Sequence, residues 1–331
     1  MSYRDGMMRF SLPTFFLSSF TALTAVLLCG CKMGVPIHVW SPPALQSTVG
    51  KSVMIPDITG PSEVADSIHE KLLQAAPTDS GRATQLLSAD DVKRTVDPLA
   101  AGGVALVSYD DADQSDLALI NTARQQGIDF ILRGEILPQR GLSSTDQADQ
   151  RIAVSWRLLP VQQDGGDQPN GKPVVVNLKS ALERYPDLGL AESAEMVLQS
   201  AVVRDTLPLI TPSVQRERVL LEIPYLTPGS KAIRRGNALA LAGRWQEAEA
   251  VWREVRDRYA FSSVAVHNLS LAAVANQDFS RARKLASKAV RMKPSKLHQQ
   301  TLVWVEREQR AYHESFGLPD PPEGWVITRA H

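Results

Sequence analysis

Apolar residues between residues 51 and 225 alternate between the period of a strand and that of an amphipathic helix. Ser52–Pro56 predicts a strand that leads through Pro61 into a helix, where Val64, Ile68 and Leu72 recur at helical spacing. In chain order we expect a strand at 84–87, a helix opened by Ser88 and Asp90, a strand at 104–108, a helix at 115–126 and a strand at 128–137. Strands at 151–161 and 173–180 around a Gly/Asp loop predict a hairpin, and a helix at 190–209 and a strand at 218–223 close the domain. The pattern therefore predicts an α/β domain with a mixed sheet over residues 51–225.

After Pro224, Pro228 and Gly229 the sequence repeats with a period of 34 residues. Gly243-Arg244-Trp245 with Ala248 recurs as Gln277-Asp278-Phe279 with Ala282. We expect helices at 230–242, 245–258, 263–275 and 279–292, and a capping helix at 295–315. The period and the small residues resemble the tetratricopeptide repeat, which implies helical hairpins over 229–315. The fold class is α+β, and residues 316–331 are expected to be an extended tail.

Charge divides between these two regions, although the whole chain has a formal net charge of zero. Residues 32–230 contain 17 basic and 25 acidic residues, a net charge of −8, whereas residues 231–313 contain 16 basic and 7 acidic residues, a net charge of +9. Two interpretations stay open: the modules dock on each other through complementary fields, or the basic module attracts an anionic partner.

The first 31 residues have the organisation of a secretory signal. Arg4 and Arg9 precede an uncharged apolar run at 10–28, and Leu28-Cys29-Gly30-Cys31 follows. That tetrapeptide resembles the lipobox, which implies cleavage after Gly30 and a diacylglycerol on the thiol of Cys31. The alternative is an uncleaved anchor, because the apolar run is near the ~20 residues that span a bilayer. We predict a signal peptide at 1–30, lipidation of Cys31 and a tether at 31–50, within which His38-Val39-Trp40 could form a short edge strand. Lys32 after the cysteine is the pattern of lipoproteins sorted to the outer membrane.

A local phrase in the α/β region carries a second resemblance. The segment Ala123–Ile136 (ARQQGIDFILRGEI) is similar to the helix-to-strand phrase of lipoproteins related to the curli secretion channel and to the activators of penicillin-binding proteins, with TolB N-terminal domains as distant kin. The resemblance covers roughly residues 50–225. It implies an envelope lipoprotein that acts through other proteins. The single predicted hairpin ends in a short polar loop, which argues against the membrane pore of the channel protein.

The motifs of catalysis and of metal binding are incomplete in this chain. Gly50-Lys51-Ser52 lacks the upstream glycine of a phosphate loop, since residue 45 is Leu45. The cluster Asp110, Asp111, Asp113 and Asp116 lacks the glycine and final glutamate of a calcium loop. The six histidines are scattered, and we find neither an HExxH pair nor a G-x-S-x-G or S-x-x-K motif. We therefore predict no catalytic residue, no metal and no cofactor, and the chain is expected not to be an enzyme.

The first helix of each repeat predicts a concave face. Arg234 and Asn237 lie on it from the first repeat, and His267 and Asn268 from the second. Asparagine amides and basic groups bind the carboxylate of a peptide C-terminus in some repeat proteins, so these four residues are the tentative peptide-binding site. A generic surface, or a face covered by the α/β domain, is the alternative.

Together these patterns predict a noncatalytic, lipid-anchored adaptor that faces the periplasm and binds protein partners in envelope assembly. The alternatives are an oligomeric secretion or export component, an activator of cell-wall synthases and an enzyme of unknown type. Neither a nucleic acid nor a small-molecule substrate is indicated.

Overall fold

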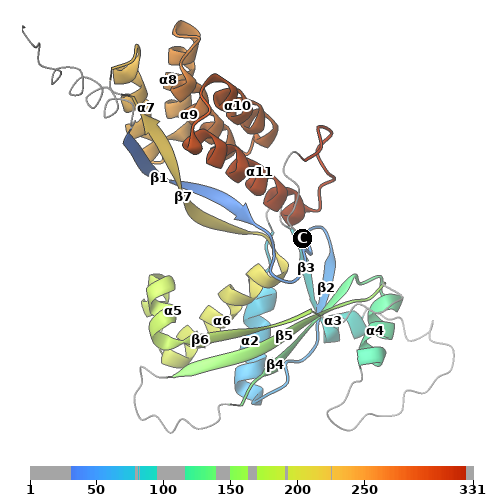
Figure 1. Cartoon of the computed structure of the whole chain (residues 1–331). Coiled ribbons are helices and arrows are strands. Elements are labelled where there is room, and N and C mark those ends of the chain that lie inside the picture. The colour runs from blue at the N-terminus through green and yellow to red at the C-terminus, as the bar shows by residue number, and fades with distance from the viewer. Residues whose placement is uncertain are drawn as a thin grey trace, which may run out of the picture. The chain divides into compact units, whose positions relative to one another are not determined.

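The computed structural model describes residues 31–78, 81, 83–94, 116–138, 150–162, 170–190, 193–224 and 226–325 (Figure 1). These residues belong to two compact units. The repeat unit comprises residues 31–39 and 216–307, and the α/β unit comprises residues 40–215 and 308–325 within the described ranges. The predicted signal peptide, the strand at 104–108 and three of the four clustered aspartates lie outside the described residues.

A five-stranded mixed sheet forms the centre of the α/β unit, as the sequence predicts. Its strands are β2 (Ser52–Ile55), β3 (Gln85–Ser88), β4 (Phe130–Ile136), β5 (Arg151–Pro160) and β6 (Asn170–Asn177). The order is β3-β2-β4-β5-β6; β2 is parallel to β3 and β4, whereas β4, β5 and β6 are successively antiparallel. The predicted hairpin is thus β5-β6.

Helices lie on both faces of this sheet because its strands alternate their apolar residues. Helices α2 (Ser62–Gln74) and α6 (Ala194–Ile210) pack on the face that presents Val53, Leu132 and Trp156. Helices α3 (Ala89–Arg94) and α4 (Asp116–Gln125) contribute to a second core on the other face, with Met54 and Ile131. Neighbouring residues in β2 and β4 therefore serve opposite layers, as the period of two requires.

One helix of the α/β unit was not expected from the sequence. The predicted strand 173–180 ends at Asn177, and α5 (Leu178–Arg184) follows, with a short 3-10 helix η2 at Pro186–Leu190. The Asn177 side chain accepts a hydrogen bond from the Ser180 N–H at 2.7 Å, which is an N-cap. The cap turns the chain out of the sheet before the predicted strand is complete.

The repeat unit contains the helices that the 34-residue period predicts, within one residue at almost every boundary. They are α7 (Ser230–Leu241), α8 (Trp245–Arg258), α9 (Ser263–Ala275), α10 (Phe279–Met292) and α11 (Lys296–Phe316), whose last turns belong to the α/β unit. Gly236 allows α7 and α8 to approach, because a Cβ at this position would lie 2.3 Å from Nε1 of Trp252. With the mixed sheet, these helices confirm the α+β class.

Residues 31–41, expected to belong to a tether, instead form strand β1 (Cys31–Ser41). It pairs with β7 (Ser213–Ile223) in a two-stranded sheet, and the two strands run in opposite directions (Figure 1). Val35, Ile37 and Val39 are buried and alternate with more exposed residues, which is strand periodicity despite Pro36. The strand expected to close the α/β domain at 218–223 is therefore part of a separate ribbon.

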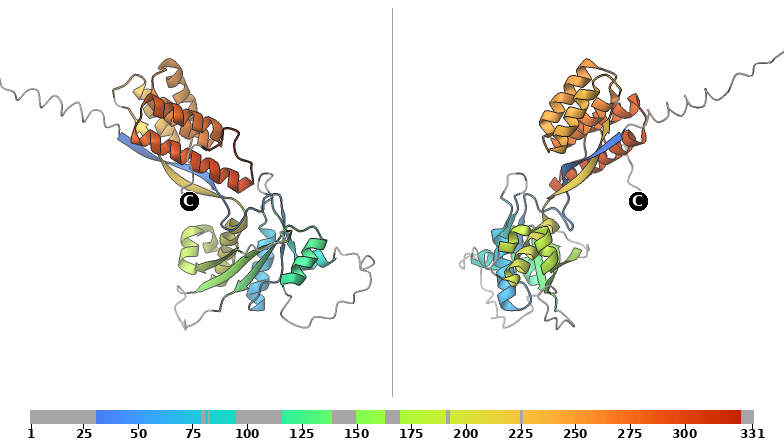
Figure 2. Two further views of the ribbon diagram at one scale, coloured as in Figure 1. Left: turned by 45° about the vertical axis from the view of Figure 1, so that its right-hand side comes forward. Right: turned by 90° about the vertical axis from the view of Figure 1, so that its left-hand side faces the viewer.

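The views in Figure 2 show the ribbon beside the helices of the repeat unit. Within the described residues, no helix combines the length and the apolar character needed to span a bilayer. Trp325 of the expected tail contacts α11, since the rings of Trp325 and His313 lie 5.6 Å apart and the guanidinium of Arg310 lies 4.8 Å from the centre of the Trp325 ring.

Candidate functional site

The repeat face on which we predicted a peptide site is largely buried in the structure. Asn237 of α7 and His267 and Asn268 of α9 are all buried, and only Arg234 is exposed. Asn237 and Asn268 lie on the side of α7 and α9 that contacts strand β7. We predicted that this face is open to a partner. Asn237, His267 and Asn268 are instead buried, because another segment of the same unit packs on this face.

That segment is strand β7. Nδ2 of Asn237 donates to the carbonyl oxygen of Glu222 at 3.1 Å, and the Glu222 N–H donates to Oδ1 of Asn268 at 3.4 Å. Nδ2 of Asn268 also donates to Oδ1 of Asn237 at 2.9 Å, so the two amides orient each other. The asparagines therefore bind the backbone of their own chain, whereas the prediction was that they bind the terminal carboxylate of a partner peptide.

The side chain of Glu222 is held in the same place by two basic groups. Its carboxylate lies 2.6 Å from Nζ of Lys293 and 2.8 Å from Nε2 of His298, and only 8% of the side chain is exposed. Burial alone would raise the pKa of Glu222, but the hydrogen bonds from His298 and Lys293 outweigh burial and lower this pKa to about 2. The strand is therefore fixed by an ionised carboxylate as well as by its backbone.

Two stacked histidine rings complete this cluster, with 4.7 Å between the centroids of His267 and His298. Nδ1 of His298 lies 2.9 Å from the Lys293 carbonyl oxygen, and Nε2 lies 2.8 Å from the Glu222 carboxylate. His267 lies between Asn268 and Thr301, and burial together with the charge of His298 lowers its pKa to about 4. The His267 ring is therefore neutral at neutral pH.

Sequence reasoning missed Glu222, Lys293 and His298 as members of this site. The one available signal was an acidic residue inside the apolar run Val219–Ile223, since an acid at such a position needs a buried partner. Neither Lys293 nor His298 belongs to a motif. The geometry of this cluster indicates that it stabilises the fold, because each of its polar groups contacts another group of the repeat unit.

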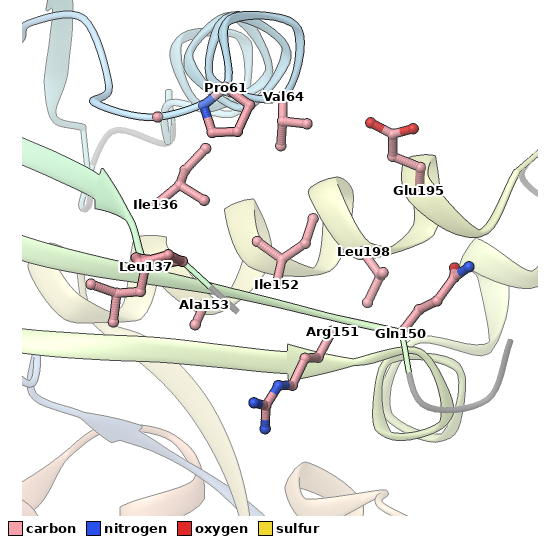
Figure 3. Close-up of a pocket in the computed structure, with 12 residues that line it drawn as sticks. Pro61, Val64, Ile136, Leu137, Gln150, Arg151, Ile152, Ala153, Glu195 and Leu198 are labelled. Atoms are coloured by element: carbon pink, nitrogen blue, oxygen red, sulfur yellow. The ribbon is translucent and has the colours of Figure 1, made fainter. Parts of the chain in front are cut away.

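An open crevice remains on the α/β unit. It encloses about 660 Å³ between the start of α2, the end of β4, the start of β5 and the first turn of α6 (Figure 3). Pro61, Val64, Ile136, Ile152 and Leu198 supply most of its wall. This volume lies within the range of ligand pockets, and its apolar wall suits an apolar side chain.

Polar groups gather on one side of the crevice. Figure 3 shows Gln150 and Glu195 on the same side, whereas the Arg151 side chain extends away from them. Oε1 of Glu195 accepts a hydrogen bond from Gln199, which in turn accepts one from Nζ of Lys71 at 2.6 Å. Burial lowers the pKa of Lys71, while the charge of Glu195 opposes that shift. The crevice is therefore an apolar slot with a carboxylate at its rim.

Neither site has the donors of a metal centre. Among the described residues, no group of three or more His, Cys, Asp and Glu side chains could hold a metal ion. Cys31 is the first residue of β1.

Comparisons with known proteins give only distant similarities. No family model matches the chain, and no curated protein matches it. A dodecameric PelC variant from Paraburkholderia phytofirmans is 13% identical, covering 54% of this chain and 98% of its own, with a TM-score of 0.28. A second PelC dodecamer from that organism is 15% identical over 54% and 97%, with a TM-score of 0.26. The hypothetical protein CT253 from Chlamydia trachomatis is 12% identical over 48% and 91%, with a TM-score of 0.26. TM-scores of this size support no inference about function.

Proposed function

We propose that this chain is a noncatalytic envelope lipoprotein, anchored through Cys31, whose α/β unit binds a protein partner in the periplasm. One observation carries the proposal: the lipobox-like sequence Leu28-Cys29-Gly30-Cys31 ends at the first residue of β1. Cleavage before Cys31 would remove the apolar run and leave both described units intact. The acyl chains would then hold the folded chain at a membrane.

The crevice of the α/β unit is the surface that we assign to the partner. The repeat face is filled by β7, whereas the slot between Val64, Ile152 and Leu198 is open. Residues 32–230 carry a net charge of −8, and Glu195 lies at the rim of the slot. The slot therefore fits a partner segment that presents an apolar side chain next to a lysine or arginine.

The anchoring is tested by intact mass and membrane fractionation of the natively expressed protein, with Cys31→Ala as the comparison. The expected result is a mature chain that begins at Cys31, carries added acyl mass and is membrane-bound only when Cys31 is present. An unprocessed chain of Cys31→Ala that stays in the membrane would instead indicate a spanning N-terminal anchor. Fractionation of the inner and outer membranes tests the outer-membrane assignment.

The partner surface is tested by photocrosslinking in the envelope. A photoreactive residue replaces Val64 in the crevice or, as the control, Val175, which is 56% exposed on the edge strand β6. We expect a discrete crosslinked species from position 64 that Leu198→Trp abolishes, because the larger ring fills the slot. Crosslinks of equal strength at both positions would contradict this assignment.

A further inference from the structure

The course of β7 shows which end of the repeat unit Cys31 occupies. Glu217 accepts a hydrogen bond from Nε1 of Trp304 in the middle of α11, and Glu222 contacts His298 near the beginning of α11. The strand therefore runs toward the end of the unit at which α11 starts. Because β1 runs opposite to β7, Cys31 and Lys32 lie at that same end (Figure 1).

Two loops of the repeats meet at this end as well. The loop after β7 leads into α7 at Ser230, and the turn between α8 and α9 lies beside it, since a Cβ on Gly229 would be 3.1 Å from the Tyr259 ring. We call this the anchor end: Cys31 and Lys32, the loop at 226–231 and the turn at 258–262.

The anchor end combines exposed apolar and basic side chains. Phe261 is 96% exposed and Leu226 is 82% exposed, which are two of the three most exposed large apolar residues that the structure describes. Lys231, Arg235 and Arg258 line a hollow of about 420 Å³ between the first turns of α7 and the last turns of α8, together with Tyr259 and one acid, Glu254. An aromatic side chain beside lysine and arginine is the composition that binds the interface of anionic membranes.

We infer that the anchor end rests on an anionic lipid surface, with Phe261 and Leu226 in the interface and the basic residues at the phosphates. The inference builds on the proposed lipidation, because it places acyl chains on Cys31 at the same end. Since Cys31 begins a paired strand, the acyl chains would reach the bilayer without a long flexible spacer. Lipid anchor and protein surface would then act as two membrane-binding signals.

The test uses the mature chain with Cys31→Ser, which contains no other cysteine because the sequence has only Cys29 and Cys31. An N-terminal hexahistidine tag attaches this protein to vesicles with a nickel-chelating lipid, so the result does not depend on lipidation in the cell. An environment-sensitive fluorophore is placed at Phe261→Cys or at Leu241→Cys. Leu241 is the matched control, since it is 50% exposed at the opposite end of α7.

On vesicles of phosphatidylethanolamine and phosphatidylglycerol, we expect the emission at position 261 to shift to the blue and that at 241 to remain aqueous. Without the tag, Lys231→Gln or Arg258→Gln should each weaken vesicle binding about fivefold. Lys284→Gln, on an exposed face of α10, should leave binding unchanged. An aqueous spectrum at 261, an equal shift at 241, or unchanged binding of both anchor-end variants would overturn the inference, whatever the fate of Cys31.

Discussion

Replacing Glu222 by glutamine should reveal how strongly the ribbon is held to the repeats. The carboxylate has a pKa of about 2 in the folded chain against an ordinary value of 4.5. This difference corresponds to a stabilisation of about 3 kcal/mol at neutral pH. The side chain is only 8% exposed, so solvent screening does not greatly reduce this figure. Glu222→Gln should therefore lower the free energy of unfolding of the repeat unit by about 3 kcal/mol at pH 7.

The pH dependence follows from the direction of the shift. Because the pKa of Glu222 is lower in the fold, its stabilisation is complete above pH 4.5 and is lost as the pH falls toward 2. About 2 kcal/mol of the difference between wild type and Glu222→Gln should be gone at pH 3. His267, with a pKa lowered from 6.5 to about 4, adds a separate loss of stability between those values. That second loss occurs in both proteins and largely cancels in the comparison.

Urea unfolding followed by circular dichroism at 222 nm measures both effects, at pH 7, 5, 4 and 3. The transition that moves between wild type and Glu222→Gln is that of the repeat unit. Glu247→Gln is the control, since Glu247 pairs with Arg244 on the surface of the same unit and both side chains are more than half exposed. A difference between wild type and Glu222→Gln that stays constant from pH 7 to pH 3 would refute the buried ion cluster.

Two further substitutions test the packing around this cluster. Gly236→Ala should destabilise the repeat unit by about 1–3 kcal/mol, because its Cβ would overlap Trp252; an unchanged urea midpoint would show that α7 and α8 can separate freely. Asn268→Ala should lower the free energy of unfolding by about 1–3 kcal/mol for each buried polar group that loses its hydrogen-bond partner. It should also speed amide hydrogen exchange in β7, since the Glu222 N–H loses its acceptor. Arg234 is exposed on α7, so Arg234→Ala should change the free energy of unfolding by less than about 0.5 kcal/mol. Equal losses of stability from Asn268→Ala and Arg234→Ala would contradict the assignment of Asn268 to a buried hydrogen-bond network.

The repeat helices could be predicted closely because their signals are local. The 34-residue period set the extent of the helices, and glycine marked a stop, as at Gly243, whose φ of 77° follows the end of α7. The ribbon could not be predicted in the same way. Pro36 and the prolines at 42 and 43 are typical of a tether, although the apolar residues Val35, Ile37 and Val39 recur at every second position, as in a strand. An edge strand tolerates proline, and its partner β7 begins more than 170 residues later, so no local pattern identifies the pairing.

The candidate site shows a related division between local and distant signals. The sequence singled out Asn237 and Asn268, but as groups for the carboxylate of a partner peptide rather than for the backbone of β7. It could not identify β7 as the occupant, because only the three-dimensional fold brings Glu222 next to these asparagines. No sequence pattern predicted the crevice of the α/β unit. Its residues Val64, Ile152 and Leu198 are ordinary apolar positions of separate elements, and only the three-dimensional fold brings them together.

The filled face explains how two repeats suffice where three or so are usual. Strand β7 covers the amide groups of Asn237 on α7 and Asn268 on α9, and the hydrogen bond from Trp304 to Glu217 joins the strand to α11. A peptide that displaced β7 would first have to break the contacts of Glu222 with Lys293 and His298 and the hydrogen bonds of its backbone to Asn237 and Asn268. Its affinity would be reduced by the free energy of these contacts. The open crevice of the α/β unit carries no such penalty, and for this reason we assign the protein partner to that unit.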